Sequence, residues 1–226
     1  MQTIIKSLKV LAVLMLLTSL SSRSYSQTSR FSFVINSPTT YFNYGKANTG
    51  LRSYKKSYHG LQAGISYQAG ITPIFSLVPE LYFAMKGGTI KGNSPLTKAK
   101  TTLRINSLEM PLLARLHLNK LYINAGPYVG YNVGGRLKVD ASNTSSASTT
   151  KLSFGSSDAD FKRWDVGFQV GAGYNFSLNQ STVTLDARYG YGMVNISPDV
   201  ERYNRMFKIS AQVSLFGKKI PKQKQG

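Results

Sequence analysis

Apolar and polar residues alternate one by one along residues 165–178, and this pattern constrains the fold more than any other feature of the sequence. One face would carry Val166, Phe168, Val170, Ala172, Tyr174, Phe176 and Leu178, and the other Asp165, Gly167, Gln169, Gly171, Gly173 and Asn175. A β-strand sends successive side chains to opposite faces, whereas an amphipathic helix groups apolar residues at spacings of three and four. The segment is therefore predicted to be a strand with one apolar and one polar face.

The same alternation recurs along most of the chain. It is found at 31–35, 60–71, 74–86, 102–118, 121–134, 181–192 and 207–215. Segment 102–118 keeps the pattern only from Leu108 onward, so a β-bulge near Asn106 is expected to switch the face there. No run of about 18 apolar residues follows the first 26 residues, which excludes membrane-spanning helices. The pattern predicts an all-β protein of eight strands.

The connections between these segments alternate in length. Those near 70–73, 118–121 and 177–181 are tight, whereas those near 43–57, 88–101, 137–160 and 194–203 are long and rich in Gly, Ser, Thr, Asn and Lys. Transmembrane barrels have short periplasmic turns and long extracellular loops. We therefore expect a transmembrane, antiparallel, up-and-down β-barrel.

The placement of glycine separates a membrane barrel from a soluble one. A soluble eight-stranded barrel would turn its apolar face inward. Here the glycines fall on the polar face, where a narrow lumen has little room, and the large aromatic residues fall on the apolar face, where lipid sets no size limit. The composition of 20 Gly, 14 Tyr and 11 Phe beside only 16% charged residues agrees with strands that end in aromatic girdles. The apolar face is thus predicted to contact lipid.

The first 26 residues have the layout of a secretory signal peptide. Lys6 and Lys9 precede an apolar run from Val10 to Leu17, and small residues precede an expected cut near Ser26/Gln27. Residues 27–217 would form the barrel domain and residues 218–226 a basic periplasmic tail. The sequence has no Cys, which excludes disulfides and cysteine-based metal sites, and two His make a histidine-rich metal site improbable. We expect no cofactor, and a location in the outer membrane of a diderm bacterium.

Several charged residues fall on the polar face of the predicted strands and should meet in the lumen. They are Glu80, Lys86, Glu109, Arg115, Asp165, Asp186, Arg188 and Lys208. Charges in a narrow interior must be paired or hydrated, because an isolated buried ion is costly. A structural network that plugs the barrel is favoured. The alternative, an ion pathway, is disfavoured because eight strands leave room for little more than side chains.

The predicted long loops are strongly basic. They contain Lys46, Arg52, Lys55, Lys56, Lys91, Lys98, Lys100, Lys138, Lys151, Lys162, Arg163, Arg202 and Arg205, and the whole chain has a formal net charge of +19. Such side chains suit outer-membrane lipids and the phosphates of lipopolysaccharide as partners. Nucleic acid would suit the charge as well, but export makes it an improbable partner. We expect a monomer.

Ser57 and His59 are candidates for a catalytic site at the outer rim. Barrels that hydrolyse lipid A need a His, a Ser and a carboxylate, and the carboxylate could come only from a loop, for example from Asp199 or Glu201. Nothing in the sequence fixes that geometry, and a triad is defined by geometry rather than by residue types. A lipid A hydrolase is therefore the alternative to a protein without enzymatic activity.

Five strings of residues resemble the PorT-like family of outer-membrane β-barrel proteins. They are PELYFAMKGG (79–88), LEMPLLARLHL (108–118), GPYVGY (126–131), DVGFQVGAGYNF (165–176) and LDARYGYGMVNI (185–196). The resemblance implies an outer-membrane barrel and transfers no catalytic residues. Some relatives are linked to protein secretion, so secretion-machinery or other envelope proteins join the expected partners. The main expectation is a non-enzymatic barrel with a binding or assembly role at the cell surface.

Overall fold

A computed structural model describes residues 29–46, 48–142, 146–155, 157, 159–178 and 181–215. The predicted signal peptide at 1–26 and the predicted tail at 218–226 lie outside these residues. Strands dominate the described chain, and the one helical element is the 3₁₀ segment η1, Thr49–Tyr54. No helix in these ranges has the length and hydropathy needed to cross a membrane. The expected all-β class is confirmed.

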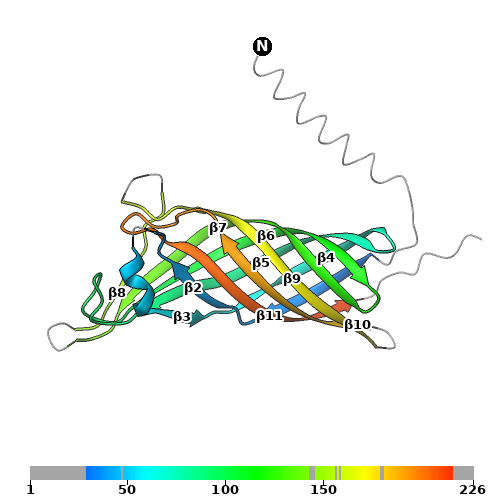
Figure 1. Cartoon of the computed structure of the whole chain (residues 1–226), viewed down its shortest axis with the longest axis horizontal. Helices are drawn as coiled ribbons and strands as arrows, with labels where there is room; N and C mark the ends of the chain where they lie inside the picture. The colour runs from blue at the N-terminus through cyan, green and yellow to red at the C-terminus, as the bar shows by residue number, and fades with distance from the viewer. Residues whose placement is uncertain are drawn as a thin grey trace, which may run out of the picture.

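The strands close into one antiparallel ring (Figure 1). Its members are β1 (Arg30–Asn36) continued by β2 (Thr39–Asn43), β3 (Lys55–His59) continued by β4 (Gln62–Thr72), β5 (Phe75–Ile90), β6 (Thr101–Leu118), β7 (Leu121–Val139), β9 (Trp164–Ser177), β10 (Ser181–Gly192) and β11 (Tyr203–Leu215). β1 closes the ring by pairing with both β4 and β11. With the two split strands counted once each, the barrel has the eight strands expected from the sequence.

The first two strands are split at the same level of the wall. Pro38 follows β1 and cannot donate a ladder hydrogen bond, because its nitrogen carries no hydrogen. The Gly60 amide donates to the Pro38 carbonyl over 2.9 Å, and the Ser37 hydroxyl donates to the Gly60 carbonyl over 2.9 Å. These bonds join the two breaks, so the wall stays continuous. The first strand begins near Phe31, where the alternation placed it.

The two ends of the barrel differ, as Figure 1 shows. Tight turns follow β4 and β6, whereas the described residues of connections 44–54, 91–100, 140–163 and 193–202 lie at the opposite end, here called the long-loop end. Three loops expected from the sequence are partly strand. β5 and β7 extend into the predicted loops 88–101 and 137–160, β3 occupies the end of 43–57, and β8 (Ser148–Lys151) pairs with the end of β7. Polar residues continue the wall there because backbone pairing does not require an apolar face.

A bulge does lie beside Asn106, but it does not switch the face of β6. The register changes from Asn106 opposite Gly134 to Ser107 opposite Asn132, so the extra residue is Val133 on β7. Leu103 and Ile105 of β6 therefore stay on the inward row with Ser107, and both are buried. The expectation of a switched face in β6 was wrong, because the lumen at this level is apolar rather than polar.

Outside and inside have opposite chemistry. The exposed outer wall includes Phe33, Ile35, Phe83, Met110, Leu112, Phe168, Val170, Leu185, Ile209 and Val213, whereas the buried inner wall includes Ser32, Gln62, Ser66, Ser107, Asn124, Gln169, Thr184, Ser210 and Gln212. Inward glycines make room for large inward side chains on the next strand. Gly173 lies opposite Tyr122, and a Cβ on Gly173 would be 2.3 Å from the Tyr122 hydroxyl oxygen. The apolar face thus points away from the lumen, as a membrane barrel requires.

Candidate functional site

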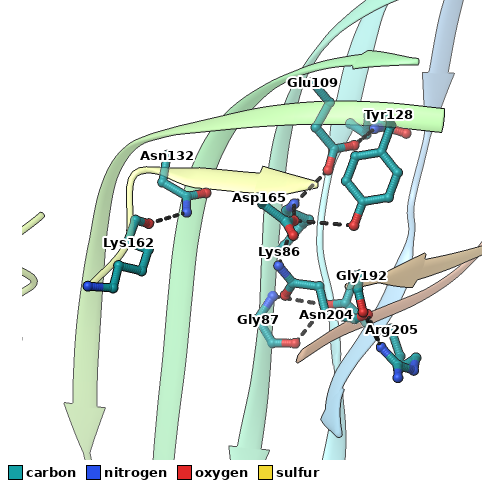
Figure 2. A network of polar contacts seen from close by, with 12 residues as sticks. Lys86, Gly87, Glu109, Tyr128, Asn132, Lys162, Asp165, Gly192, Asn204 and Arg205 are labelled. Carbon is teal, nitrogen blue, oxygen red and sulfur yellow. Dashed lines mark hydrogen bonds and ion pairs between the residues drawn. The ribbon is translucent and has the colours of Figure 1, made fainter. Parts of the chain in front are cut away.

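Lys86 is at the centre of one lumenal ion cluster (Figure 2). Its Nζ lies 2.6 Å from Glu109 Oε1 and 2.8 Å from Asp165 Oδ2, and all three side chains are buried. Asn204 and the Tyr128 hydroxyl both donate to Asp165 Oδ2, over 2.8 and 3.3 Å. β5, which carries Lys86, and β9, which carries Asp165, are not neighbours in the ring. The cluster therefore ties the wall across the lumen.

Arg188 organises a second cluster. Its two terminal nitrogens donate to the two oxygens of Glu80 over 2.5 and 2.9 Å, and its Nε lies 2.5 Å from Asp186 Oδ1. The Tyr122 hydroxyl and the Asn124 amide both donate to Asp186 Oδ2, over 2.6 and 2.9 Å. Paired N–H donors match a carboxylate, which makes this the stronger kind of ion pair. β5 and β10, which carry Glu80 and Arg188, lie on opposite sides of the ring.

Arg115 and Lys208 are buried in the lumen without an ion pair among the described residues. Arg115 donates to Gln68 over 3.0 Å and lies 3.9 Å from the centre of the Tyr122 ring. Lys208 donates to Gln62 Oε1 over 3.3 Å and lies 4.7 Å from the centre of the Tyr82 ring. Cation–π contacts replace the missing carboxylates. The structure thus places all eight lumenal candidates inside the barrel, but groups six of them into two separate clusters.

An apolar cap closes the lumen at the long-loop end. It consists of Phe42, Tyr44, Leu51, Ile90, Leu103, Ile105 and Ile196, with Tyr54, Leu137, Leu152, Phe154, Phe161 and Val200 packed against it. The sequence reasoning missed this cap. The one available signal was the loss of alternation at 102–107, where apolar residues fall on the inward row.

Connection 193–202 folds over this cap. Ile196 is fully buried, and its carbonyl accepts a hydrogen bond from the Lys162 amide over 3.1 Å. Arg202 is buried and binds both Ser197 and Asp199 through its guanidinium. Partial burial alone would raise the pKa of Asp199, but the hydrogen bonds from Arg202 and Ser197 outweigh burial and hold that pKa below its usual range. A cavity of about 230 Å³ lies beside this ion pair, between Tyr44, Ile90 and Leu103.

Ser57 and His59 lie on β3 in a different setting. His59 is exposed, and its Nδ1 lies 3.1 Å from the Thr39 hydroxyl rather than near a carboxylate. Ser57 is exposed and forms no side-chain hydrogen bond with His59. Asp199, one of the two candidate carboxylates, is bound by Arg202 and Ser197. Within the described residues the structure therefore does not bring Ser57, His59 and a carboxylate together by hydrogen bonds. No group of three or more His, Asp or Glu residues in that part of the chain could hold a metal ion.

Residues 22–197 match a family model described as an outer membrane protein beta-barrel domain. The chain belongs to this family. Its structure is similar to that of the attachment invasion locus protein Ail of Yersinia pestis, at 13% identity over 82% of this chain and 99% of that chain, with a TM-score of 0.43. It is also similar to neisserial surface protein A, at 14% identity over 82% of this chain and 96% of that chain, with a TM-score of 0.42. No curated protein matches the sequence.

Membership of the outer membrane β-barrel family agrees with the expected location in the outer membrane. In such barrels the long loops face the cell exterior and the tight turns face the periplasm. The long-loop end, with its apolar cap and its basic side chains, is therefore the extracellular end.

Proposed function

We propose that this member of the outer membrane β-barrel family is a non-conducting protein without enzymatic activity whose extracellular end is a basic surface for binding or assembly. The observation that carries the proposal is the filled lumen. Val78 of β5, Leu113 of β6, and Asp165 and Gln169 of β9 are each 0% exposed. A barrel with no water-filled path exposes only its two ends and its lipid-facing wall.

The charge of the extracellular end supports a binding role. Lys46, Lys55, Lys56, Lys91, Lys98 and Lys151 are all exposed there. A surface of one sign attracts partners of the opposite sign and speeds their encounter. Lipopolysaccharide and acidic regions of other envelope proteins are the partners of matching chemistry.

We also propose that the chain is a PorT-like member of the family. The resemblance that supports this lies in five strings, at 79–88, 108–118, 126–131, 165–176 and 185–196. It implies a role as an accessory to protein secretion. A lipid A hydrolase is not favoured, because among the described residues Ser57 and His59 share no hydrogen bond, and neither is bonded to a carboxylate.

Site-specific photocrosslinking in native outer membranes tests the proposal. A photoreactive residue at position 46, 91 or 98 would report the extracellular end, and one at Lys120 in a tight turn would report the periplasmic end as the matched control. We expect a discrete crosslinked product from the extracellular positions, weakened when neighbouring lysines are replaced by Gln. A product formed only from position 120, or one indifferent to those replacements, would contradict the proposal.

A further inference from the structure

Three bases lie in one row across the extracellular ends of β6, β7 and β8. Arg104 is the register partner of Arg136, and Arg136 is the register partner of Lys151. Side chains that face each other directly across strands have their Cβ atoms about 5 Å apart, and like charges in such positions destabilise a sheet. The row therefore concentrates three positive charges on one face of the wall.

None of these three side chains has an anionic partner in the described residues. Arg104, Arg136 and Lys151 form no side-chain hydrogen bond or ion pair there. Two nearby bases do have an anionic partner: Lys100 and Lys138 both form ion pairs with the Asp140 carboxylate, over 3.0 and 3.4 Å. The sequence analysis did not predict this row, because Arg104 lies in the irregular first half of segment 102–118 and Arg136 lies between the predicted strand 121–134 and the predicted loop 137–160.

The next row adds hydroxyl groups. Thr102 is the register partner of Lys138, and Lys138 is that of Thr149. A hollow of about 270 Å³ lies between these rows, lined by Tyr58, Thr102, Arg104, Arg136, Lys138 and Thr149. Hydroxyl, guanidinium and ammonium groups together match the oxygens of a phosphate.

This hollow opens on the outer wall rather than on the mouth of the barrel. Leu103 and Leu137, the chain neighbours of its lining residues, point inward to the apolar cap and its cavity. Leu108 is exposed on the lipid-facing row of β6, and Arg104 lies four residues before it, toward the extracellular end of the strand. Four residues span about 13 Å, or about 10 Å of height in a strand tilted by about 40°. The hollow therefore lies just above the apolar band, at the level of lipid head groups.

We propose that Arg104 and Arg136, which line the hollow with Thr102 and Thr149, form a site for the phosphate of an outer-leaflet lipid head group, such as a phosphorylated lipid A. Lys151 extends their row beside the hollow and adds its charge to the site. The site rests on the proposed function and makes it specific, because it gives the basic extracellular end a lipid partner held from the side. A phosphate there would neutralise the row that no carboxylate of the described chain neutralises.

Lipid retention by the folded protein tests this site. Wild type, the triple variant Arg104→Gln/Arg136→Gln/Lys151→Gln and the control Lys46→Gln/Lys91→Gln/Lys98→Gln would be titrated with bis-phosphorylated lipid A in detergent and examined by native mass spectrometry. The control removes the same charge from the same end, at exposed lysines outside the hollow. The control lysines belong to the wider basic surface and contribute only long-range attraction, so we expect the control to lose much less affinity than the site variant. The site variant should bind one lipid at least about tenfold more weakly than wild type. Removal of both phosphates from the lipid should weaken binding to wild type by a similar factor.

Three outcomes would overturn the site. Equal lipid binding by wild type and the site variant would refute the site. An equal loss in both triple variants would assign the binding to diffuse charge, leaving the proposed function standing and the site refuted. Competition by inorganic phosphate at a concentration matching the lipid would assign the row to a soluble anion instead of a lipid.

Discussion

At the residue scale, the stability of the polar interior depends on which buried bases form ion pairs with which carboxylates. Alternation alone predicts that Arg188 and Glu80 point inward, because every second residue of a strand does so. It does not predict that they meet, because they lie 108 positions apart on strands that only ring closure brings face to face. It also gives no sign that Arg115 lies over the Tyr122 ring rather than beside a carboxylate.

Replacement of Arg188 by Met should destabilise the barrel strongly. The change leaves Glu80 and Asp186 buried without their cation, which costs about 3–5 kcal/mol when one partner of a buried pair is removed. Arg115→Met is the matched control, and it should cost about 1–2 kcal/mol because only a hydrogen bond and a ring contact are lost. Urea unfolding in micelles measures both, and equal losses would contradict the cluster as described.

Gly173→Ala should also destabilise the protein. The new methyl group would meet the Tyr122 ring and hydroxyl at 2.3 Å and the Leu185 carbonyl oxygen at 2.6 Å, so backbone must move. Overpacking of this kind costs about 1–3 kcal/mol. Gly134→Ala is the control, because a Cβ there meets nothing within 4 Å. Unfolding midpoints that shift equally for both variants would show that Gly173 is not needed for packing.

At the element scale, strand existence could be predicted well and strand ends could not. Periodicity identified the lipid-facing part of each strand, because lipid demands an apolar row there. Outside the membrane no apolar row is needed, and β7 continues to Val139 through polar residues whose composition is typical of a loop. The bulge was expected in the right place but on the wrong strand, since the sequence of one strand does not show which partner holds the extra residue.

The order of connection 193–202 should depend on pH. The pKa of Asp199 lies below its usual range, so its ion pair stabilises the connection fully above about pH 4, the unperturbed value, and the contribution is lost as pH falls through the folded-state pKa. The sequence has no Cys, so a single spin label at Pro198→Cys is unambiguous. The label should be restrained at pH 7 and more mobile at pH 3. In an Asp199→Asn background it should be mobile at both, and a label unaffected by pH would refute the role of the ion pair.

At the scale of the whole molecule, the barrel is closed in two senses. Backbone pairing between β1 and β11 leaves the ring without a gap, and side chains fill what the ring encloses. Closure and the outward apolar face follow from alternation, glycine placement and the length of the connections. The apolar cap could not be predicted in this way. Its seven buried residues come from several strands and connections, and in the sequence they only interrupt the alternation.

Ion conductance in a planar lipid bilayer tests the filled lumen most directly. Folded protein would be inserted at high salt, with insertion verified independently by protection from protease. The buried inner wall and the apolar cap predict no current steps above those of the bare membrane at moderate voltage. Stable, reproducible conductance steps from the folded wild type would contradict the account.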